Sequence, residues 1–457
     1  MKRGNCGGRR YIMIFAEIIK KYFGFEERGT SFRIEAGAGL ATFLTMSYII
    51  FVQPAVLGDA GMDKGAVFTA TCLASALACV IMGLYANYPI AQAPLMGENF
   101  FFTYTVVLGM GYSWEKALGL VFISGLVFLA LTLTRLRERL VDAVPESLKF
   151  AIASGIGLFV ALIGFKEAGL ITASSSTLVK LGSVTSAPVV CAMTGLIVMA
   201  ALFVRKIKGA VLIGIFVSGA AAWAAGLTKF SSVVSAPPSL APTLFKLDLA
   251  GLMTPDALAV ALIFLFMSLF DTLGTLLGVG VQAGLMKDGK LERVSKALVS
   301  DAVATTAGAL MGTSTVSSYI ESAAGVAQGG RTGFTAITVG ALFLLSLFFS
   351  PLVGAINASL PLGDGTFIHP VTAPALILVG ALMMSSVCRI DWHDMSAAIP
   401  AFITLALIPF TFNIADGIAF GFISFALIKT LSGRHKDVPP LLWAISALLA
   451  MRYAFLK

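Results

Sequence analysis

Long apolar runs separated by short polar segments repeat along almost the whole chain. Most runs have about 20 residues, the length of helix that crosses a bilayer. The pattern predicts fourteen transmembrane helices, seven in each half of the sequence. We place them near 36–56, 66–85, 95–110, 115–134, 146–165, 187–204, 209–227, 257–281, 296–312, 318–328, 333–350, 372–388, 397–412 and 414–431. A linker rich in Ser and Pro, roughly 228–255, separates the two halves.

The composition supports this interpretation. The chain is 58% hydrophobic and only 12% charged, whereas a soluble domain has about 25% charged residues. There is too little polar material to cover a water-facing surface. The sequence therefore predicts an all-α polytopic membrane protein.

The basic residues predict an orientation. If the N-terminus is cytoplasmic, the segments on the inner side hold 26 of the 32 Lys and Arg residues, as the positive-inside rule requires. Those segments are 1–35, 135–149, 205–208, 287–296, Arg331, Arg389 and the tail from Lys429. We expect a multi-pass protein of the cell inner membrane with both termini in the cytoplasm. The net charge of +8 then faces anionic lipid and does not indicate a nucleic-acid partner.

The end of the chain allows two interpretations. Residues 433–457 form a C-terminal tail whose segment 439–457 is apolar but short, and carries Arg452. We expect an interfacial helix there. The alternative is a fifteenth span.

An odd number of spans per half places the second half in the membrane upside down relative to the first. Weak similarity between the fourth and eleventh spans, with Gly125, Phe128 and Leu129 matching Gly340, Phe343 and Leu344, supports a 7+7 inverted repeat. This arrangement is typical of secondary transporters, which bind substrate where helices are broken at matching positions of the two halves.

Two spans have the composition of broken helices. The third begins "NYPIAQAPLMGENFFFTYTVV" and the tenth begins "MGTSTVSSYIESAAGVAQGGRTG". Proline, glycine and small β-prone residues in each favour a short extended segment, and a helix becomes possible only afterwards. Each of these spans therefore predicts an extended segment followed by a half-helix.

Three carboxylates lie at or near these breaks: Glu98, Glu321 and, in the eighth span, Asp271. A carboxylate at the centre of a membrane helix costs about 2.5–3.5 kcal/mol, so it normally faces a cavity or a partner. No Lys or Arg lies in the apolar part of the eighth or tenth span. The three groups can bind a proton, accept N–H bonds from a ligand, or merely cap a helix.

The eighth span also predicts a polar stripe. Helical spacing puts Ser268, Asp271, Thr272 and Thr275 on one face, which we expect to line a polar cavity. Leu265, Leu269, Leu276 and Val279 form the opposite, aliphatic face.

Enzymatic chemistry has little support. The five cysteines form no CxxC pair, and the three histidines are too few and too scattered for a haem or a metal cluster. No zincin or GxSxG motif occurs. We expect no cofactor, no metal and no enzymatic activity, and we treat a membrane enzyme or a channel as weaker alternatives to a transporter.

Several segments resemble the AzgA-like purine permeases of the nucleobase:cation symporter family, which also includes uracil and xanthine permeases. The resemblance extends from about Gly37 to Gly433. The segments that carry it are "TFLTMSYIIFVQPAVL", "FFTYTVVLGMGYSW", "LFDTLGTL", "GTSTVSSYIESAAGVAQGGRTG" and "TAPALILVGALMM". It implies proton-coupled import of adenine, guanine or hypoxanthine by alternating access.

The resemblance also implies a division into a core and a gate. Spans one to four and eight to eleven would form the core, and the other spans the gate. The implied boundaries are an N-terminal segment 1–35, core halves 36–134 and 256–350, and gate halves 135–232 and 366–432. A homodimer is left open.

By the same resemblance, Asp271 and Glu321 hold the nucleobase and are the proton-coupling candidates. The remaining substrate-binding candidates are Thr275, Tyr319, Ile320, Ser322, Glu98, Asn99 and Phe101. In the third span the family usually has an apolar residue where this chain has Glu98, and a small one where it has Phe100. Gln53 stands where Asn is usual. These departures bear on the substrate, and they leave another nucleobase or a small anion as alternatives.

Overall fold

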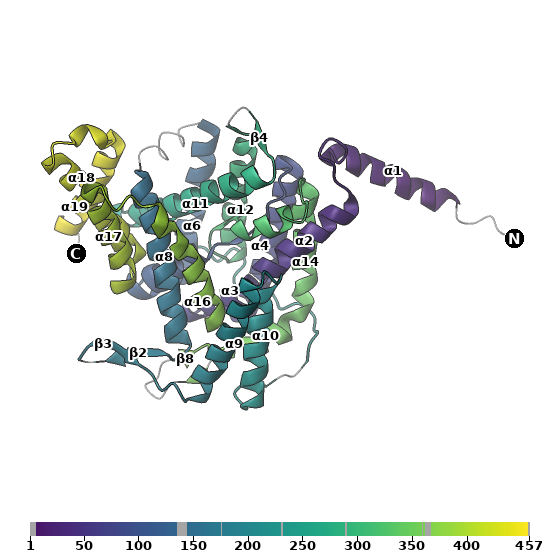
Figure 1. The fold of residues 1–457 in the computed structure, drawn as a ribbon, viewed down its shortest axis with the longest axis horizontal. Coiled ribbons are helices and arrows are strands. Elements are labelled where there is room, and N and C mark those ends of the chain that lie inside the picture. Colours follow the sequence, from purple (N-terminus) through teal and green to yellow (C-terminus); the bar gives the residue numbers. More distant parts are fainter. Residues whose placement is uncertain are drawn as a thin grey trace.

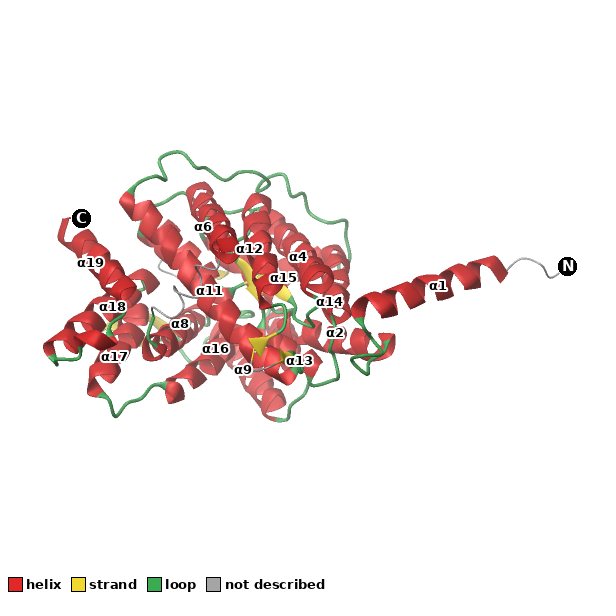
Figure 2. Ribbon diagram, turned by 90° about the horizontal axis from the view of Figure 1, so that it is seen from above, coloured by secondary structure: helices red, strands yellow, loops and turns green. Residues whose placement is uncertain are grey.

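The computed structural model describes residues 6–134, 144–174, 176–229, 232–287, 290–358, 360–361 and 367–455. Most of the described chain is helical and forms one body, from which α1 (Cys6–Phe23) projects (Figures 1 and 2). Most of the basic loop expected on the inner side at 135–149 lies outside the described residues.

Each of the fourteen predicted spans coincides with helical structure. The first span is α2 (Phe32–Met46) followed, after a turn at Ser47 and Tyr48, by α3 (Ile49–Asp59). The other unbroken spans of the first half are α4 (Lys64–Ile81) with its π-helical end η1 (Met82–Ala86), α6 (Trp114–Thr134), α8 (Glu146–Glu167), α9 (Ala187–Val204) and α10 (Ala210–Ala224).

The second half repeats the plan. Its helices are α11 (Pro255–Gln282), α12 (Val294–Met311), α14 (Gly333–Ser346), η4 (Leu347–Phe349), α15 (Ser350–Ile356), α16 (Ala373–Met383), η5 (Met384–Arg389), α17 (Met395–Phe410), α18 (Ile414–Leu431), η6 (His435–Asp437) and α19 (Pro440–Phe455). Among the described residues, eight helical stretches are long and apolar enough to cross a membrane. Helix α19 packs on α18, and its relation to the membrane remains a prediction.

The third and tenth spans are broken as the sequence predicts. The third consists of β1 (Gln92–Pro94), α5 (Met96–Phe100) and the π-helical η2 (Phe101–Gly109). The tenth consists of β6 (Val316–Ser318), a 3-10 turn η3 (Ile320–Ser322) and α13 (Ala323–Val326). Three further two-stranded pairs lie in loops: β2 (Ile171–Ser174) with β3 (Leu178–Leu181), β4 (Met286–Lys287) with β5 (Lys290–Leu291), and β7 (Leu360–Pro361) with β8 (Phe367–Ile368).

The helices pack in two groups. In the first group α12 contacts α6 and α4, α14 contacts α2 and α4, and α11 contacts α6. In the second group α8 contacts α16 and α17, α17 contacts α18, and α9 contacts α10 and α16. Small residues let the backbones approach within each group. A Cβ on Gly125 of α6 would lie 2.6 Å from Thr306 Oγ1 of α12, and one on Gly157 of α8 would lie 2.9 Å from the Gly380 carbonyl of α16.

The ends of α11 follow from its sequence. The Thr254 hydroxyl accepts a bond from Ala257 N at 3.3 Å, and Pro255 takes the first helical position, where its missing N–H costs nothing. The helix stops just before Gly284, whose φ of 70° suits glycine. These signals fix a 28-residue helix, long enough to carry the middle of the site.

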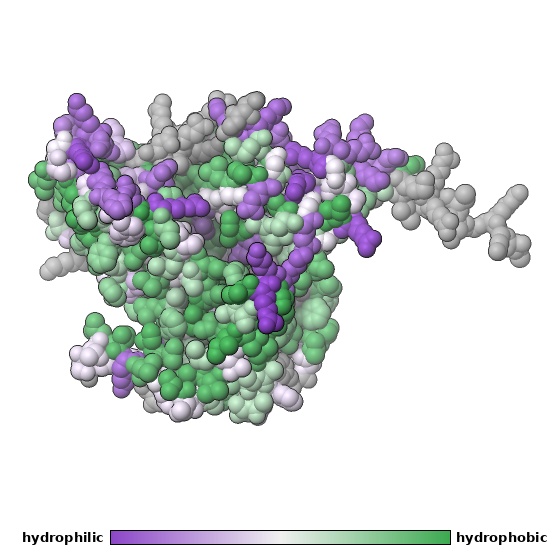
Figure 3. Space-filling view, viewed as in Figure 1, coloured by the Kyte–Doolittle hydropathy of each residue, from purple (hydrophilic) through white to green (hydrophobic). Residues whose placement is uncertain are grey.

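The surface separates into zones along the long axis of the helices. Apolar residues cover most of the middle and lower part of the face drawn in Figure 3, and hydrophilic residues concentrate near its upper edge. The upper edge carries β4, while β2, β3 and β8 lie at the lower end (Figure 1). On this face the molecule therefore has a polar upper end above a broad lipid-compatible band.

Candidate functional site

Two extended segments from opposite halves of the chain pair inside the helical body. Strands β1 and β6 are antiparallel, with Gln92 opposite Ser318 and Pro94 opposite Val316. Two backbone bonds lengthen the pairing: Leu95 N donates to Thr315 O at 3.0 Å, and Tyr319 N donates to Ala91 O at 2.9 Å. The strands are fully buried, so each satisfies backbone groups of the other that lipid would leave unpaired.

Asp271 lies beside this crossing on an exposed stripe of α11. Asp271, Gly274 and Gly278 are exposed, whereas the stretch 263–269 just before them is entirely buried. The stripe therefore runs from the middle of the helix toward its C-terminal end and β4. Thr275, one turn after Asp271, is 5% exposed.

The predicted polar stripe of α11 is wrong in part. Only Asp271 of the four residues faces open space, because Ser268, Thr272 and Thr275 are buried. Thr272 turns toward α12 and contacts Asp301 there. The aliphatic residues packed among neighbouring helices, as expected, are Leu265, Leu269, Leu276 and Val279.

Glu321 lies half-buried at the start of the tenth half-helix and is held by a tyrosine. The Tyr48 hydroxyl donates to Glu321 Oε1 at 2.9 Å. Ile320 beside it is 54% exposed. The 3-10 turn η3, which carries Glu321, contacts α11, the helix of Asp271.

Other residues expected to bind substrate are part of the scaffold. The Tyr319 hydroxyl donates to the Pro94 carbonyl, and the Ser322 hydroxyl accepts from Ala91 N at 3.0 Å. Phe101 is fully buried and packs edge to face on Phe264 of α11, with ring centroids 4.7 Å apart. These contacts hold the third and tenth spans together.

Asn99 also belongs to the scaffold. Its amide donates to the Gln53 side chain and its carbonyl oxygen accepts from Ser314. Gln53 in turn donates to Thr313 Oγ1 at 2.9 Å. Both functional ends of Asn99 are therefore occupied, and the usual Asn at position 53 would be one methylene shorter.

Glu98 differs from its neighbours because part of it has no partner. It is 2% exposed, and its Oε1 atom has no hydrogen bond within the described chain. The helix that carries it, α5, contacts both α11 and α8, and the adjacent Gly97 packs against Ile156 of α8, from which an added Cβ would be 3.0 Å away. Glu98 thus belongs to a helix that lies between α11 and the second helix group.

Sequence reasoning missed Asp301, a carboxylate of α12 that is completely buried beneath the crossing. Its Oδ2 accepts from Thr272 Oγ1 and from Ser317 Oγ, both at 2.6 Å. Its Oδ1 accepts from Ser318 Oγ at 3.0 Å and from the Gln92 amide. One carboxylate therefore ties α11, β1 and β6 to α12.

Tyr48 was missed as well, because the first span carries no charge and nothing in it singles out this tyrosine. Asp301 could have been found as a charge inside the predicted ninth span, where Thr305 follows one turn later. The sequence does not indicate which residues Asp301 and Tyr48 contact.

Comparison with known proteins gives consistent matches. Residues 33–420 match the Permease family, which covers xanthine and uracil permeases. The guanine/hypoxanthine permease PbuG of Bacillus subtilis is 45% identical over 451 residues, covering 96% of this chain and 100% of that protein. The adenine permease AdeP of Escherichia coli is 42% identical over 440 residues and covers 96% of both.

Solved structures show the fold. The transmembrane domain of the cyanobacterial bicarbonate transporter BicA superposes with a TM-score of 0.62 over 84% of this chain and 96% of that chain. Sequence identity is 14%, so the likeness concerns the fold alone.

Proposed function

The chain belongs to the Permease family of membrane transport proteins, as the predicted resemblance implied, and from this premise we propose that it imports purine nucleobases together with protons. The names of the two relatives support the substrate class. The observation that carries the proposal is the placement of Asp271 and Glu321 beside the β1–β6 crossing, where both remain accessible.

Two carboxylates suit a purine because its ring N–H groups, and in adenine and guanine the exocyclic amine, are hydrogen-bond donors. Charge-assisted bonds of this kind are about twice as strong as neutral ones. In our proposal Glu321, oriented by Tyr48, accepts from one edge of the base and Asp271 from another. The exposed Ile320 offers its backbone, and Thr275 lies within one turn of Asp271.

The remaining candidate residues act through the scaffold in this proposal. Tyr319, Ser322, Asn99 and Phe101 fix the crossing and the position of α11. Glu98 is the exception, because its unpartnered oxygen lies near Asp271 and can receive a donor from the ligand or a proton.

We assign proton coupling to Asp271, with Glu321 as its partner. Mutual repulsion between two carboxylates in a site within the membrane is relieved when one of them takes a proton. Substrate and proton would then occupy one site, and their binding would be linked. Asp271 is the better candidate because its side chain makes no hydrogen bond to another described residue. Glu321, in contrast, accepts a hydrogen bond from Tyr48.

For the transport cycle we assign the first helix group to a core domain, 36–134 and 256–350, and the second to a gate domain, 135–232 and 366–432. The crossing and its carboxylates belong to the core, and α8 belongs to the gate. Movement of the core against the gate would expose the site alternately to the two sides.

We further propose that both termini face the cytoplasm. The upper end in Figure 1, with β4 and the loops rich in Lys and Arg, is then the inner side. The exposed stripe of α11 runs toward that end, which supports a site that opens to the cytoplasm in this proposal.

The test is purine uptake into proteoliposomes, with and without an imposed pH gradient. The native protein is expected to concentrate hypoxanthine, guanine or adenine against their gradient, and excess uracil or bicarbonate is not expected to compete. Asp271→Asn keeps the shape of the protonated side chain and should still exchange purine, but without gradient-driven accumulation. Glu115→Gln, a carboxylate change at the start of α6, serves as the control.

Two results would contradict the proposal. Competition by bicarbonate but not by purines would show that the site binds an anion and not a purine. Full gradient-driven accumulation by Asp271→Asn would move proton coupling to Glu321 or Glu98.

A further inference from the structure

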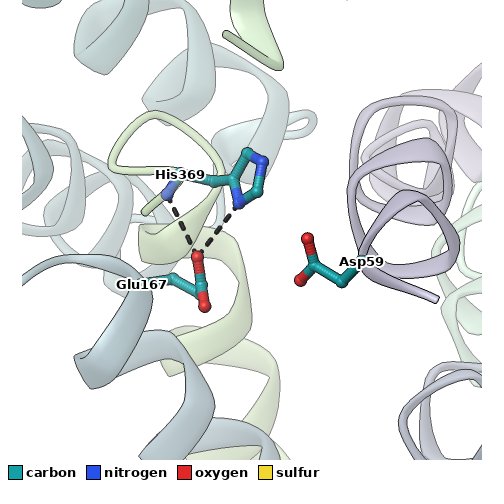
Figure 4. Close-up of side chains that lie close together, drawn as sticks. All are labelled: Asp59, Glu167 and His369. Carbon is teal, nitrogen blue, oxygen red and sulfur yellow. Dashed lines mark hydrogen bonds and ion pairs between the residues drawn. The ribbon is translucent and has the colours of Figure 1, made fainter. Parts of the chain in front are cut away.

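A second polar cluster lies away from the carboxylate site, at the end of the molecule that carries β2, β3 and β8 (Figure 1). Asp59 ends α3 and Lys64 begins α4, so both belong to the first helix group. Glu167 ends α8, and His369 follows β8, so both belong to the second. Figure 4 shows Glu167 and His369 facing each other, with Asp59 pointing toward them from a separate helix.

The half of the cluster on the second group is held together internally. Glu167 Oε2 lies 3.0 Å from His369 Nδ1 and also accepts from the His369 backbone N–H at 3.1 Å. Glu167 is 4% exposed and His369 is 3% exposed. A doubly bonded carboxylate fixes both the backbone and the ring orientation of the histidine.

The part of the cluster that belongs to the first helix group is also held in place by a hydrogen bond. The Tyr104 hydroxyl donates to Asp59 Oδ2 at 2.8 Å, which aims the Asp59 carboxylate toward the cluster. The ligand atoms of Asp59, Glu167 and His369 all lie within 4.8 Å of one another. Together with Val52, Val56 and Leu376 they line a small cavity between the two helix groups.

Two contacts of this cluster cross from one group to the other. Lys64 Nζ lies 3.3 Å from His369 Nε2, and Lys166 Nζ lies over the Tyr104 ring at 5.9 Å from its centroid. Lys64 is half-buried, whereas the Lys166 side chain is 43% exposed. The Lys64–His369 contact is therefore the less screened of the two.

Two carboxylates and a histidine are also a ligand set for a divalent metal. The Lys64 ammonium decides against that interpretation. If His369 Nδ1–H donates to Glu167, then Nε2 accepts from Lys64, and the cluster already contains a cation beside its two carboxylates. A metal ion would meet that ammonium at short range.

We propose that Lys64, Asp59, Glu167 and His369 form a latch that keeps the core and the gate together on the side opposite the exposed stripe of α11. This inference rests on the proposed alternating-access function. The latch closes that side while the carboxylate site is open to the other, and its Lys64–His369 contact has to break when the core moves.

The test measures opening of that side directly. Thr372 lines the cavity on the gate side, so Thr372→Cys in a protein otherwise free of cysteine reports on access from that side. A membrane-impermeant maleimide should label it slowly when the latch is intact. Lys64→Met should raise the labelling rate roughly tenfold, because the loss of a bond to a charged group shifts the two-state equilibrium by about that factor.

Matched variants separate the latch from simple loss of charge. His369→Gln retains an acceptor for Lys64 and should raise labelling less than Lys64→Met. Lys166→Met removes a lysine from the same cluster at its exposed edge and should change labelling little. Each variant must be reconstituted in a known orientation. Its melting temperature must equal that of the native protein.

The outcomes are distinguishable from failure of the proposed function. Labelling that rises in Lys64→Met supports the latch even if purine is not the substrate. Unchanged labelling in Lys64→Met, with purine uptake intact, overturns it. Stabilisation of the native protein but not of His369→Gln by Zn²⁺ alone would show that the cluster is a metal site and would also overturn the latch.

Discussion

Carboxylates in the membrane part of this protein occur in two kinds of surroundings. Asp301 is fully buried and accepts bonds from Thr272, Ser317, Ser318 and Gln92. Asp271, Glu321 and Glu98 lie near the same β1–β6 crossing, where one is exposed, one is half-buried, and one has an oxygen without a partner among the described residues.

The difference indicates which carboxylates are available to a ligand. Desolvation of a charge is tolerated when the protein supplies the bonds that water would make. Asp301 has its bonds already and therefore holds the crossing in place. The other three retain acceptor capacity, which a substrate or a proton can use.

Glu321→Gln should show the largest effect on the open side of the crossing. Glutamine still accepts from Tyr48, so the fold is kept, but the charge that receives purine N–H bonds is gone. Two charge-assisted bonds at about 1.5–3 kcal/mol each make the expected loss in purine affinity at least about 100-fold. Equilibrium binding to purified protein, with thermal unfolding as the control for folding, measures this. Unchanged affinity would remove Glu321 from the substrate site.

Asp301→Asn should show the opposite pattern, with stability as the main loss. The new amide is a donor facing hydroxyl donors, which costs about 1–3 kcal/mol, or roughly 1–3 °C in the melting temperature of a chain of this length. Thr272→Val removes a single donor and should cost less. Thermal unfolding in detergent gives both values. An unchanged melting temperature for Asp301→Asn would mean that its bonds do not hold the crossing.

Glu98→Leu restores the residue type usual in the family and should alter specificity more than total uptake. Removal of a third carboxylate should shift the substrate ranking toward hypoxanthine and guanine, by about tenfold in the ratio of competing purines. Glu98→Gln keeps the size and separates charge from volume. Identical competition profiles for the native protein and Glu98→Leu would show that Glu98 does not determine specificity and acts only as a helix cap.

Asp394, outside the membrane at the start of α17, should give the smallest effect. Its Oδ1 accepts from Ser396, and Lys429 lies 3.1 Å from Oδ2. These bonds lower the pKa of the carboxyl from its ordinary 3.8 to about 2. A lowered pKa in the folded state stabilises the fold above the ordinary value, and this contribution is lost as the pH falls from about 4 to 2.

Asp394→Asn should therefore unfold at a slightly lower temperature than the native protein at neutral pH. The expected loss of stability is that of a partly exposed ion pair, at most about 1 kcal/mol. The gap between the two should close as the pH falls through that window. A gap that persists at pH 2 would show that packing, and not charge, is responsible.

The helical plan could be predicted from the sequence because it depends on local properties. Apolar runs and breaks such as "APLMGEN" and "GTSTVSS" set the spans and the two extended segments, and both segments appear where expected. Asp271 and Glu321 could be picked out since a charge in an apolar run needs a reason. On α11, however, the stripe containing Thr272 was assigned to one cavity, and the structure divides it between two environments.

The sequence by itself determined that this chain crosses a membrane many times and where its helices break, because bilayer thickness and backbone hydrogen bonding constrain short stretches independently of the rest. Only the tertiary structure decided what each polar residue contacts. The pairing of Gln92 with Ser318 and the meeting of Lys64 with His369 join positions more than 200 residues apart. Such pairings depend on how complete helices pack, and helix packing is set by many side chains at once.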